Sequence, residues 1–216
     1  MDFEIIKEYM PYFMKGTLMT LGMSLLGILI GVIVGLFIAL GKMTPNKLVR
    51  APFTIYITII RGTPTLVQLF LIHFAILPAI YEDRTAILSA IVMLSVNSSA
   101  YVAEIFRSGI ESIHSGQMEA ARSLGMNKVQ AMRYVVLPQA TRRVVPPLGN
   151  EFITLIKESS LAAMIAAPEL MYWGRAAVGK HLVVWEPYIT VAVIYLIIVL
   201  ALTYLLQIVE KKWINV

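Results

Sequence analysis

The chain has 216 residues, of which 58% are hydrophobic and 14% are charged, and its mean hydropathy is +0.77. So little charge cannot solvate a globule of this size, which excludes an ordinary soluble protein and indicates a membrane protein. The formal net charge of +5 does not indicate a nucleic-acid partner, because the basic residues stand at the ends of apolar runs and form no patch.

Five apolar segments are long enough to cross a bilayer. They cover residues 16–41, 51–80, 86 to about 106, about 148–167 and about 183–209. The first carries no charge and would measure about 39 Å as a helix, which spans the hydrocarbon layer with some tilt. We therefore expect an all-α integral membrane protein with five transmembrane helices, in which residues 1–216 form a single domain in contact with lipid.

Three glycines in the first segment indicate how it packs. Gly27, Gly31 and Gly35 repeat at four-residue spacing, so they share one helical face. A glycine stripe allows two membrane helices to approach closely, and we expect this face to contact another span.

The second segment contains a charge, a glycine and a proline at membrane depth, in the run Arg61-Gly62-Thr63-Pro64. Because proline removes a helical hydrogen bond and clashes with the preceding turn, a kink or break is expected near Thr63. Arg61 either contacts substrate or pairs with an acidic residue. This run, with Gln68 four residues after the proline, resembles the Arg-Gly-Thr-Pro-x-x-x-Gln stretch of permeases for polar amino acids.

Polar side chains in the third and fourth segments each fall on one helical face. The third segment has them at spacings of four, three and four residues, at Asn97, Tyr101, Glu104 and Ser108. The fourth has Glu151, Thr154 and Glu158 at spacings of three and four. Carboxylates at this depth are costly and should face a bundle interior or a water-filled cavity.

We therefore predict a small substrate cavity near mid-membrane. Its predicted lining is Gln68, Asn97, Tyr101, Glu151, Thr154 and Glu158. Two stacked carboxylates repel each other unless a cation lies nearby, which favours a basic amino acid over glutamine or glutamate. The exposed backbone amides near residues 62–65 and the side-chain amides of Gln68 and Asn97 are expected to donate to the ligand's own carboxylate. In the alternative interpretation, Glu158 forms a structural pair with Arg61 or Lys157.

A polar, helix-forming insert covers residues 114–138. Ser115 can cap a helix whose apolar face is formed by Met118, Ala121 and Leu124, and Gly125 can end it in the left-handed conformation. Asn127 and Gln130 suggest a capping box at the start of a second short helix, and Pro138 is expected to close the unit.

This insert resembles the cytoplasmic coupling loop of ABC-importer permeases. The resemblance lies in Glu-Ala-Ala, then Gly after three intervening residues, and Leu-Pro after a fixed gap, with Val135 where the family has isoleucine. The positions that match are Glu119, Ala120, Ala121, Gly125, Leu137 and Pro138. The resemblance implies a type I ABC-importer permease in a bacterial inner membrane. It also implies a second permease subunit, identical or different, two cytoplasmic ATP-binding subunits and an extracellular or periplasmic amino-acid-binding protein.

No catalytic or cofactor site is expected in this chain, so ATP and Mg²⁺ would belong to the partner ATPase. The run 174–180 looks like a phosphate loop, but His181 stands where Ser or Thr is required. There is no cysteine, and His73, His114 and His181 stand apart, so no metal site is predicted. A secondary transporter would need inverted repeats, which an odd number of spans does not supply.

The basic residues predict the orientation in the membrane. They cluster after the first segment, after the third and at the end of the chain, while the acidic start and residues 82–84 lie on the opposite side. The basic positions are Lys42, Lys47, Arg50, Arg107, Arg122, Lys128, Arg133, Arg142, Arg143, Lys211 and Lys212. By the positive-inside rule, the N-terminus is expected outside and the C-terminus in the cytoplasm.

Overall fold

The computed structural model describes residues 3–82 and 85–214, and within these ranges every regular element is a helix. The expected acidic turn at 82–84 lies mostly outside the described residues. The first half of the chain forms α1 (Phe3–Lys42), α2 (Lys47–Gly62), α3 (Thr65–Leu71), a π-helix (Ile72–Ile76), α4 (Leu77–Ile80) and α5 (Ala86–Glu111). The second half forms α6 (Ser115–Ser123), α7 (Lys128–Ala131), a π-helix (Met132–Val136), α8 (Leu137–Glu158), a 3-10 helix (Ser159–Ile165), α9 (Leu170–His181) and α10 (Trp185–Ile214).

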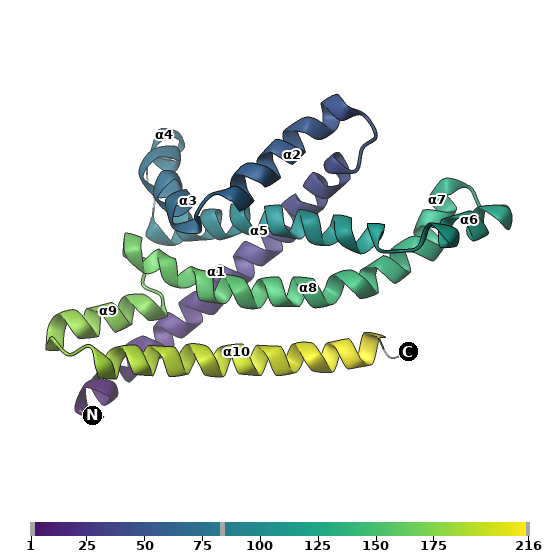
Figure 1. Cartoon of the computed structure of the whole chain (residues 1–216). Coiled ribbons are helices and arrows are strands. Elements are labelled where there is room, and N and C mark those ends of the chain that lie inside the picture. The colour runs from purple at the N-terminus through teal and green to yellow at the C-terminus, as the bar shows by residue number, and fades with distance from the viewer. Residues whose placement is uncertain (1–2, 83–84, 215–216) are drawn as a thin grey trace.

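The long helices lie side by side with their loops grouped at two ends (Figure 1). Helix α1 crosses α5 and α8, and α8 packs between α5 and α10. The N-terminus and α9 lie at one end of the bundle, whereas α6, α7 and the C-terminal end lie at the other. The basic segments identified in the sequence therefore gather at the same end as the α6–α7 unit.

Length and apolar composition identify α1, α5 and α10 as candidate membrane spans among the described residues, and α2 with residues 65–80 makes a fourth if that bent pair is one span. The expectation of five spans is therefore met only in part. The segment expected at 148–167 is not one apolar helix, because α8 ends at Glu158 and a 3-10 helix follows. The first half of α8 is polar, so this helix carries less apolar surface than a lipid-facing helix needs. Helix α8 instead packs against α1, α5 and α10.

The glycine stripe of α1 packs against α5, as predicted. A Cβ atom on Gly31 would lie 2.4 Å from Oγ of Ser98, and one on Gly35 would lie 2.8 Å from the Ser99 carbonyl oxygen. Neither position has room for a side chain, so these glycines set the distance between the two helices.

A buried carboxylate joins three helices at the end of the bundle that holds the N-terminus. Glu169 is 0% exposed and caps α9, accepting hydrogen bonds from the amides of Met171 at 2.9 Å and Tyr172 at 2.7 Å. It also accepts from Tyr195 of α10 at 2.8 Å and from Thr20 of α1 at 3.4 Å. Sequence reasoning missed this residue, because its partners are distant in the chain.

The start of α1 and the end of α9 are joined by a second polar contact. Lys180 donates a hydrogen bond to Glu8, and His181 lies 3.2 Å from the other oxygen of the same carboxylate. This hydrogen bond raises the pKa of Lys180 above its ordinary value. The segment that looked like a phosphate loop lies inside α9 and is helical, which agrees with its rejection as a nucleotide site.

The glycine packing predicts that Gly31→Leu will destabilise the protein by about 1–3 kcal/mol, because the new side chain collides with α5. Gly22→Leu is the matched control, since a Cβ there meets nothing within 4 Å. Thermal unfolding of the detergent-solubilised protein measures both variants. Equal midpoints for the two would contradict the close approach of α1 and α5.

Candidate functional site

The second apolar segment is broken where the sequence predicted it. Helix α2 and the helical segment beginning at Thr65 meet at an angle of 108°. Thr63 between them is extended, with φ −118° and ψ 148°. The proline that follows cannot donate the backbone hydrogen bond that would continue α2, so the helix ends here.

The side chain of Gln68 supplies the hydrogen bond that proline lacks. In an unbroken helix the carbonyl of Ile60 would accept from the amide of residue 64, which in this chain is Pro64. Instead, Nε2 of Gln68 donates to the Ile60 carbonyl at 2.7 Å. The same nitrogen lies 3.1 Å from the backbone carbonyl oxygen of Thr63 and 2.9 Å from Oγ1 of that residue. This buried amide therefore satisfies the acceptors that the break exposes.

Gln68 and Asn97 lie together, as the sequence suggested, but they bind each other. Nδ2 of Asn97 donates to Oε1 of Gln68 at 3.3 Å and lies 3.5 Å from Oγ1 of Thr65. Asn97 is 2% exposed and Gln68 is 6% exposed. The amide nitrogens that we expected to face a ligand are thus engaged within the protein.

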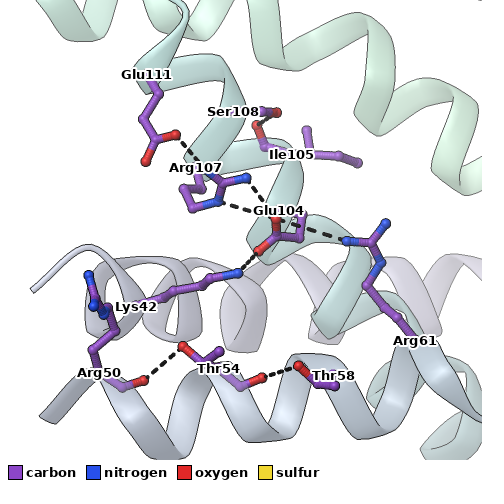
Figure 2. Close-up of polar contacts among 10 residues, drawn as sticks. All are labelled: Lys42, Arg50, Thr54, Thr58, Arg61, Glu104, Ile105, Arg107, Ser108 and Glu111. Atoms are coloured by element: carbon purple, nitrogen blue, oxygen red, sulfur yellow. Dashed lines mark hydrogen bonds and ion pairs between the residues drawn. The ribbon is translucent and has the colours of Figure 1, made fainter. Parts of the chain in front are cut away.

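A cluster of charges surrounds Glu104 where α1, α2 and α5 meet (Figure 2). Lys42 lies 2.5 Å from Oε1 of Glu104. Arg107 donates to Oε2 through Nη2 at 2.9 Å and Nε at 3.2 Å, and it also pairs with Glu111. Arg61 lies farther away, with Nη1 3.9 Å from Oε2. The sequence placed Glu104 on a polar face but did not identify these partners.

Arg61 pairs with an acid, and that acid is Glu104 of α5. No ion pair joins Arg61 to Glu158 among the described residues, so that structural alternative is corrected. The guanidinium carbon lies 5.0 Å from the centre of the Tyr101 ring, within the range of a cation–π contact. Ser108, the last member of the predicted stripe, donates instead to the carbonyl of Ile105.

The carboxylates of α8, Glu151 and Glu158, form no ion pair with a cation among the described residues. Glu151 and Glu158 are both half-buried, and Oε2 of Glu158 is buried without a hydrogen-bond partner among the described residues. The charges of Glu158 and Arg61 both act on Glu151, and the charge of the exposed Lys157 acts on Glu158. Thr154, between the two acids, donates to the carbonyl of Asn150 in its own helix at 3.1 Å. The face carries negative charge that the protein leaves partly unpaired.

The insert folds as two short helices, with one correction at its start. Helix α6 begins at Ser115, but its cap is His114, whose Nδ1 accepts a hydrogen bond from the Gly116 amide at 3.0 Å. Gly125 has φ +88°, which confirms the left-handed turn. The capping box of Asn127 is also confirmed, with two reciprocal hydrogen bonds of 2.9 Å to Gln130.

The apolar face and the end of the insert differ from the prediction. Met118 packs against the small core of this unit and Ala121 is buried, but Leu124 is 83% exposed because the chain turns away at that point. Pro138 does not close the unit. It lies in the first turn of α8, directly after the π-helix, so the insert continues into α8.

The surface of this unit carries a polar hollow beside exposed apolar side chains. The hollow has a volume of about 460 Å³. Its lining is Glu119, Arg122, Ser123, Gly125, Met126 and Asn127. Leu124, Val129 and Tyr134 are exposed by 83%, 74% and 63%. Such a mixed surface is suited to contact with another protein.

The described residues contain no group of three or more His, Asp or Glu side chains placed to hold a metal ion. The described residues thus combine a broken apolar segment, half-buried carboxylates on α8 and a two-helix unit at one end of the bundle. The chain matches the family described as binding-protein-dependent transport system inner membrane component over residues 27–215, and it belongs to that family. It is therefore a permease component and not the catalytic subunit of such a system.

Several relatives resemble the chain over almost their whole length. The probable amino-acid ABC transporter permease protein YckA of Bacillus subtilis (strain 168) is 42% identical over 95% of this chain and 91% of its own. The glutamine transport system permease protein GlnP of Escherichia coli (strain K12) is 37% identical over 98% and 97%. A crystal structure of an amino acid ABC transporter with histidines shares 42% identity and a TM-score of 0.93, covering 98% of this chain and 99% of that one.

The geometry at Pro64 predicts the effect of removing the Gln68 amide. Gln68→Met keeps the side-chain length but leaves the Ile60 and Thr63 carbonyls unsatisfied, which should cost about 1–3 kcal/mol. In a Pro64→Ala background the restored backbone amide can serve Ile60, so the same substitution should cost less. Thermal unfolding of the two single variants and the double variant measures this difference. Strict additivity would show that Gln68 does not replace the proline amide.

Proposed function

We propose that this chain is the permease subunit of an ABC importer for polar amino acids. The names of its relatives support the substrate class, because they include amino-acid and glutamine permeases. In this proposal α8 is a fifth span, which tolerates polar residues because α1, α5 and α10 cover it. Two permease subunits, identical or different, would form the pore, with two cytoplasmic ATP-binding subunits and an extracellular or periplasmic binding protein.

The substrate we propose is a basic amino acid, such as arginine, lysine or histidine. The observation that carries this choice is the buried Oε2 of Glu158, which lacks a hydrogen-bond donor among the described residues. A buried carboxylate oxygen without a donor is costly, and a guanidinium or ammonium group of the substrate would satisfy it. Glu151 lies on the same face and adds negative charge. Glutamine is the alternative, supported by the name of the Escherichia coli relative.

The path from the ATPase to the substrate would run along a single helix. The α6–α7 unit leads through the π-helix into α8 without a loop. Glu151 lies fourteen residues after Leu137, or about 21 Å along the helix axis. A rigid shift of the docked unit would therefore move the carboxylate face, which is the alternating access expected of an importer.

The carboxylate proposal predicts that Glu158→Gln will weaken the binding of arginine by about tenfold or more, because a charge-assisted hydrogen bond is replaced by a neutral one. Glu151→Gln should weaken it as well, whereas Glu82→Gln, the same change at an exposed position outside α8, is the control. Binding to the detergent-solubilised complex is the measurement. Unchanged affinity for arginine, lysine and histidine in both glutamate variants would rule out the cationic site at Glu151 and Glu158.

The coupling proposal predicts that Gly125→Val will reduce transport per ATP hydrolysed while membrane insertion stays normal. A β-branched residue in the left-handed conformation costs about 1 kcal/mol or more and would tilt the unit in its groove. Gly125→Asn is the matched control, because asparagine tolerates this conformation and a Cβ there meets nothing within 4 Å. Glu119→Lys, which reverses a charge on the hollow, should also uncouple. Normal transport in both Gly125→Val and Glu119→Lys would refute the assignment of this loop.

The orientation proposal places α6 in the cytoplasm and the turn between α9 and α10 outside. The chain has no cysteine, so single cysteines can be introduced at exposed positions without background. Leu124 and Leu182 are 83% and 86% exposed. In intact cells an impermeant thiol reagent should modify Leu182→Cys and leave Leu124→Cys unmodified. Modification of both from outside would mean that the spans have been counted wrongly.

A further inference from the structure

Arg61 is the loosely held cation of the Glu104 cluster. Both oxygens of Glu104 already have closer partners, since Oε1 is 2.5 Å from Lys42 and Oε2 accepts from Arg107 at 2.9 Å. The 3.9 Å between Arg61 and the same oxygen exceeds the length of a hydrogen bond. Of the three cations in the cluster, Arg61 therefore contributes least to Glu104.

The charge balance of the cluster also leaves one cation over. Its positive members are Lys42, Arg61 and Arg107, and its negative members are Glu104 and Glu111. Three positive and two negative charges leave a net charge of +1. The Arg61 side chain is 43% exposed, against 20% for Lys42 and 29% for Arg107. The excess charge is thus carried by the guanidinium that is most accessible to a ligand.

Arg61 lies where α2 ends. It is the second-last residue of α2, beside the break at Pro64, and the Tyr101 ring holds the guanidinium by a cation–π contact. The charge of Arg61 also acts on Glu151 of α8. A small ligand with one negative and at least one positive group would find opposite charges on Arg61 and on the carboxylates of α8.

The two side-chain amides that the sequence suggested for binding a carboxylate, those of Gln68 and Asn97, already donate to groups of the protein. Nε2 of Gln68 serves Ile60 and Thr63, and Nδ2 of Asn97 serves Gln68. A guanidinium can donate two parallel hydrogen bonds to a carboxylate, and it remains charged in any environment. Among the described side-chain donors next to the break, Arg61 is therefore favoured as the anion-binding group.

We propose that Arg61 binds the α-carboxylate of the transported amino acid, while Glu151 and Glu158 bind its positive groups. This inference rests on the proposed function and deepens it, because it specifies a free α-carboxylate as part of the substrate. Arg61 is then a substrate-binding residue, and its contact with Glu104 and Tyr101 orients the guanidinium when the site is empty.

The test compares each amino acid with its α-amide, which removes the negative charge and little else. The probes are arginine and glutamine with argininamide and glutaminamide, bound to the purified assembled transporter without its binding protein. The unmodified complex should prefer each acid over its amide. Arg61→Gln should lose about tenfold to a hundredfold in affinity for the acid and little for the amide, so that the preference disappears.

Arg107→Gln is the matched control, because it removes a closer cation from Glu104 and should leave the preference for the acid intact. Arg61→Lys, which keeps the charge but not the two-pronged donor, should retain part of the preference and serves if Arg61→Gln does not assemble. An equal loss of acid and amide in both Arg61 variants, or a selective loss in Arg107→Gln, would make Arg61 a structural partner of Glu104 and overturn the inference.

These results separate the inference from the function on which it rests. If the unmodified complex binds neither the amino acids nor their amides, and histidine and lysine also fail, the proposed function is wrong and the inference falls with it. If the amino acids bind but the α-amides bind equally well, the proposed function stands and the inference alone is overturned.

Discussion

The break at Pro64 is the constraint on which the candidate site depends. An interrupted helix at membrane depth exposes carbonyl groups, and each must be satisfied within the protein because no bulk water is available there. The Gln68 amide does this for Ile60 and Thr63. Since that amide is also bound by Asn97, the break is fixed to α5, and Arg61 is held at the end of α2 facing the Glu104 cluster.

Glu104 and Glu158 differ in how the protein pairs their carboxylates, and this difference separates a structural role from the binding role that we propose. Glu104 is surrounded by cations from three helices, so it ties α1, α2 and α5 together. Glu158 has a buried oxygen with no donor among the described residues. Because an unpaired buried carboxylate destabilises the folded state, its presence on the helix that continues from the α6–α7 unit favours a role in binding.

Local signals in the sequence predicted several features correctly. Gly125 takes the left-handed turn, Asn127 forms the capping box, and Gly31 marks the close approach of α1 to α5, because each depends on the backbone of one residue or on one helical face. The cap at Ser115, the buried face at Leu124 and the stop at Pro138 were wrong. In each case a neighbouring residue or the direction of the following helix decided the outcome.

The sequence by itself determined that the chain is a helical membrane protein, that its second span is broken, and which polar residues lie on common helical faces. These properties follow from composition and helical periodicity, which are local. Only the tertiary structure decided that Gln68 serves the backbone, that Arg61 lies at Glu104 rather than Glu158, and that Glu169 joins α1, α9 and α10. Such pairings depend on how distant helices cross, and the spacing of residues along one helix does not encode that crossing.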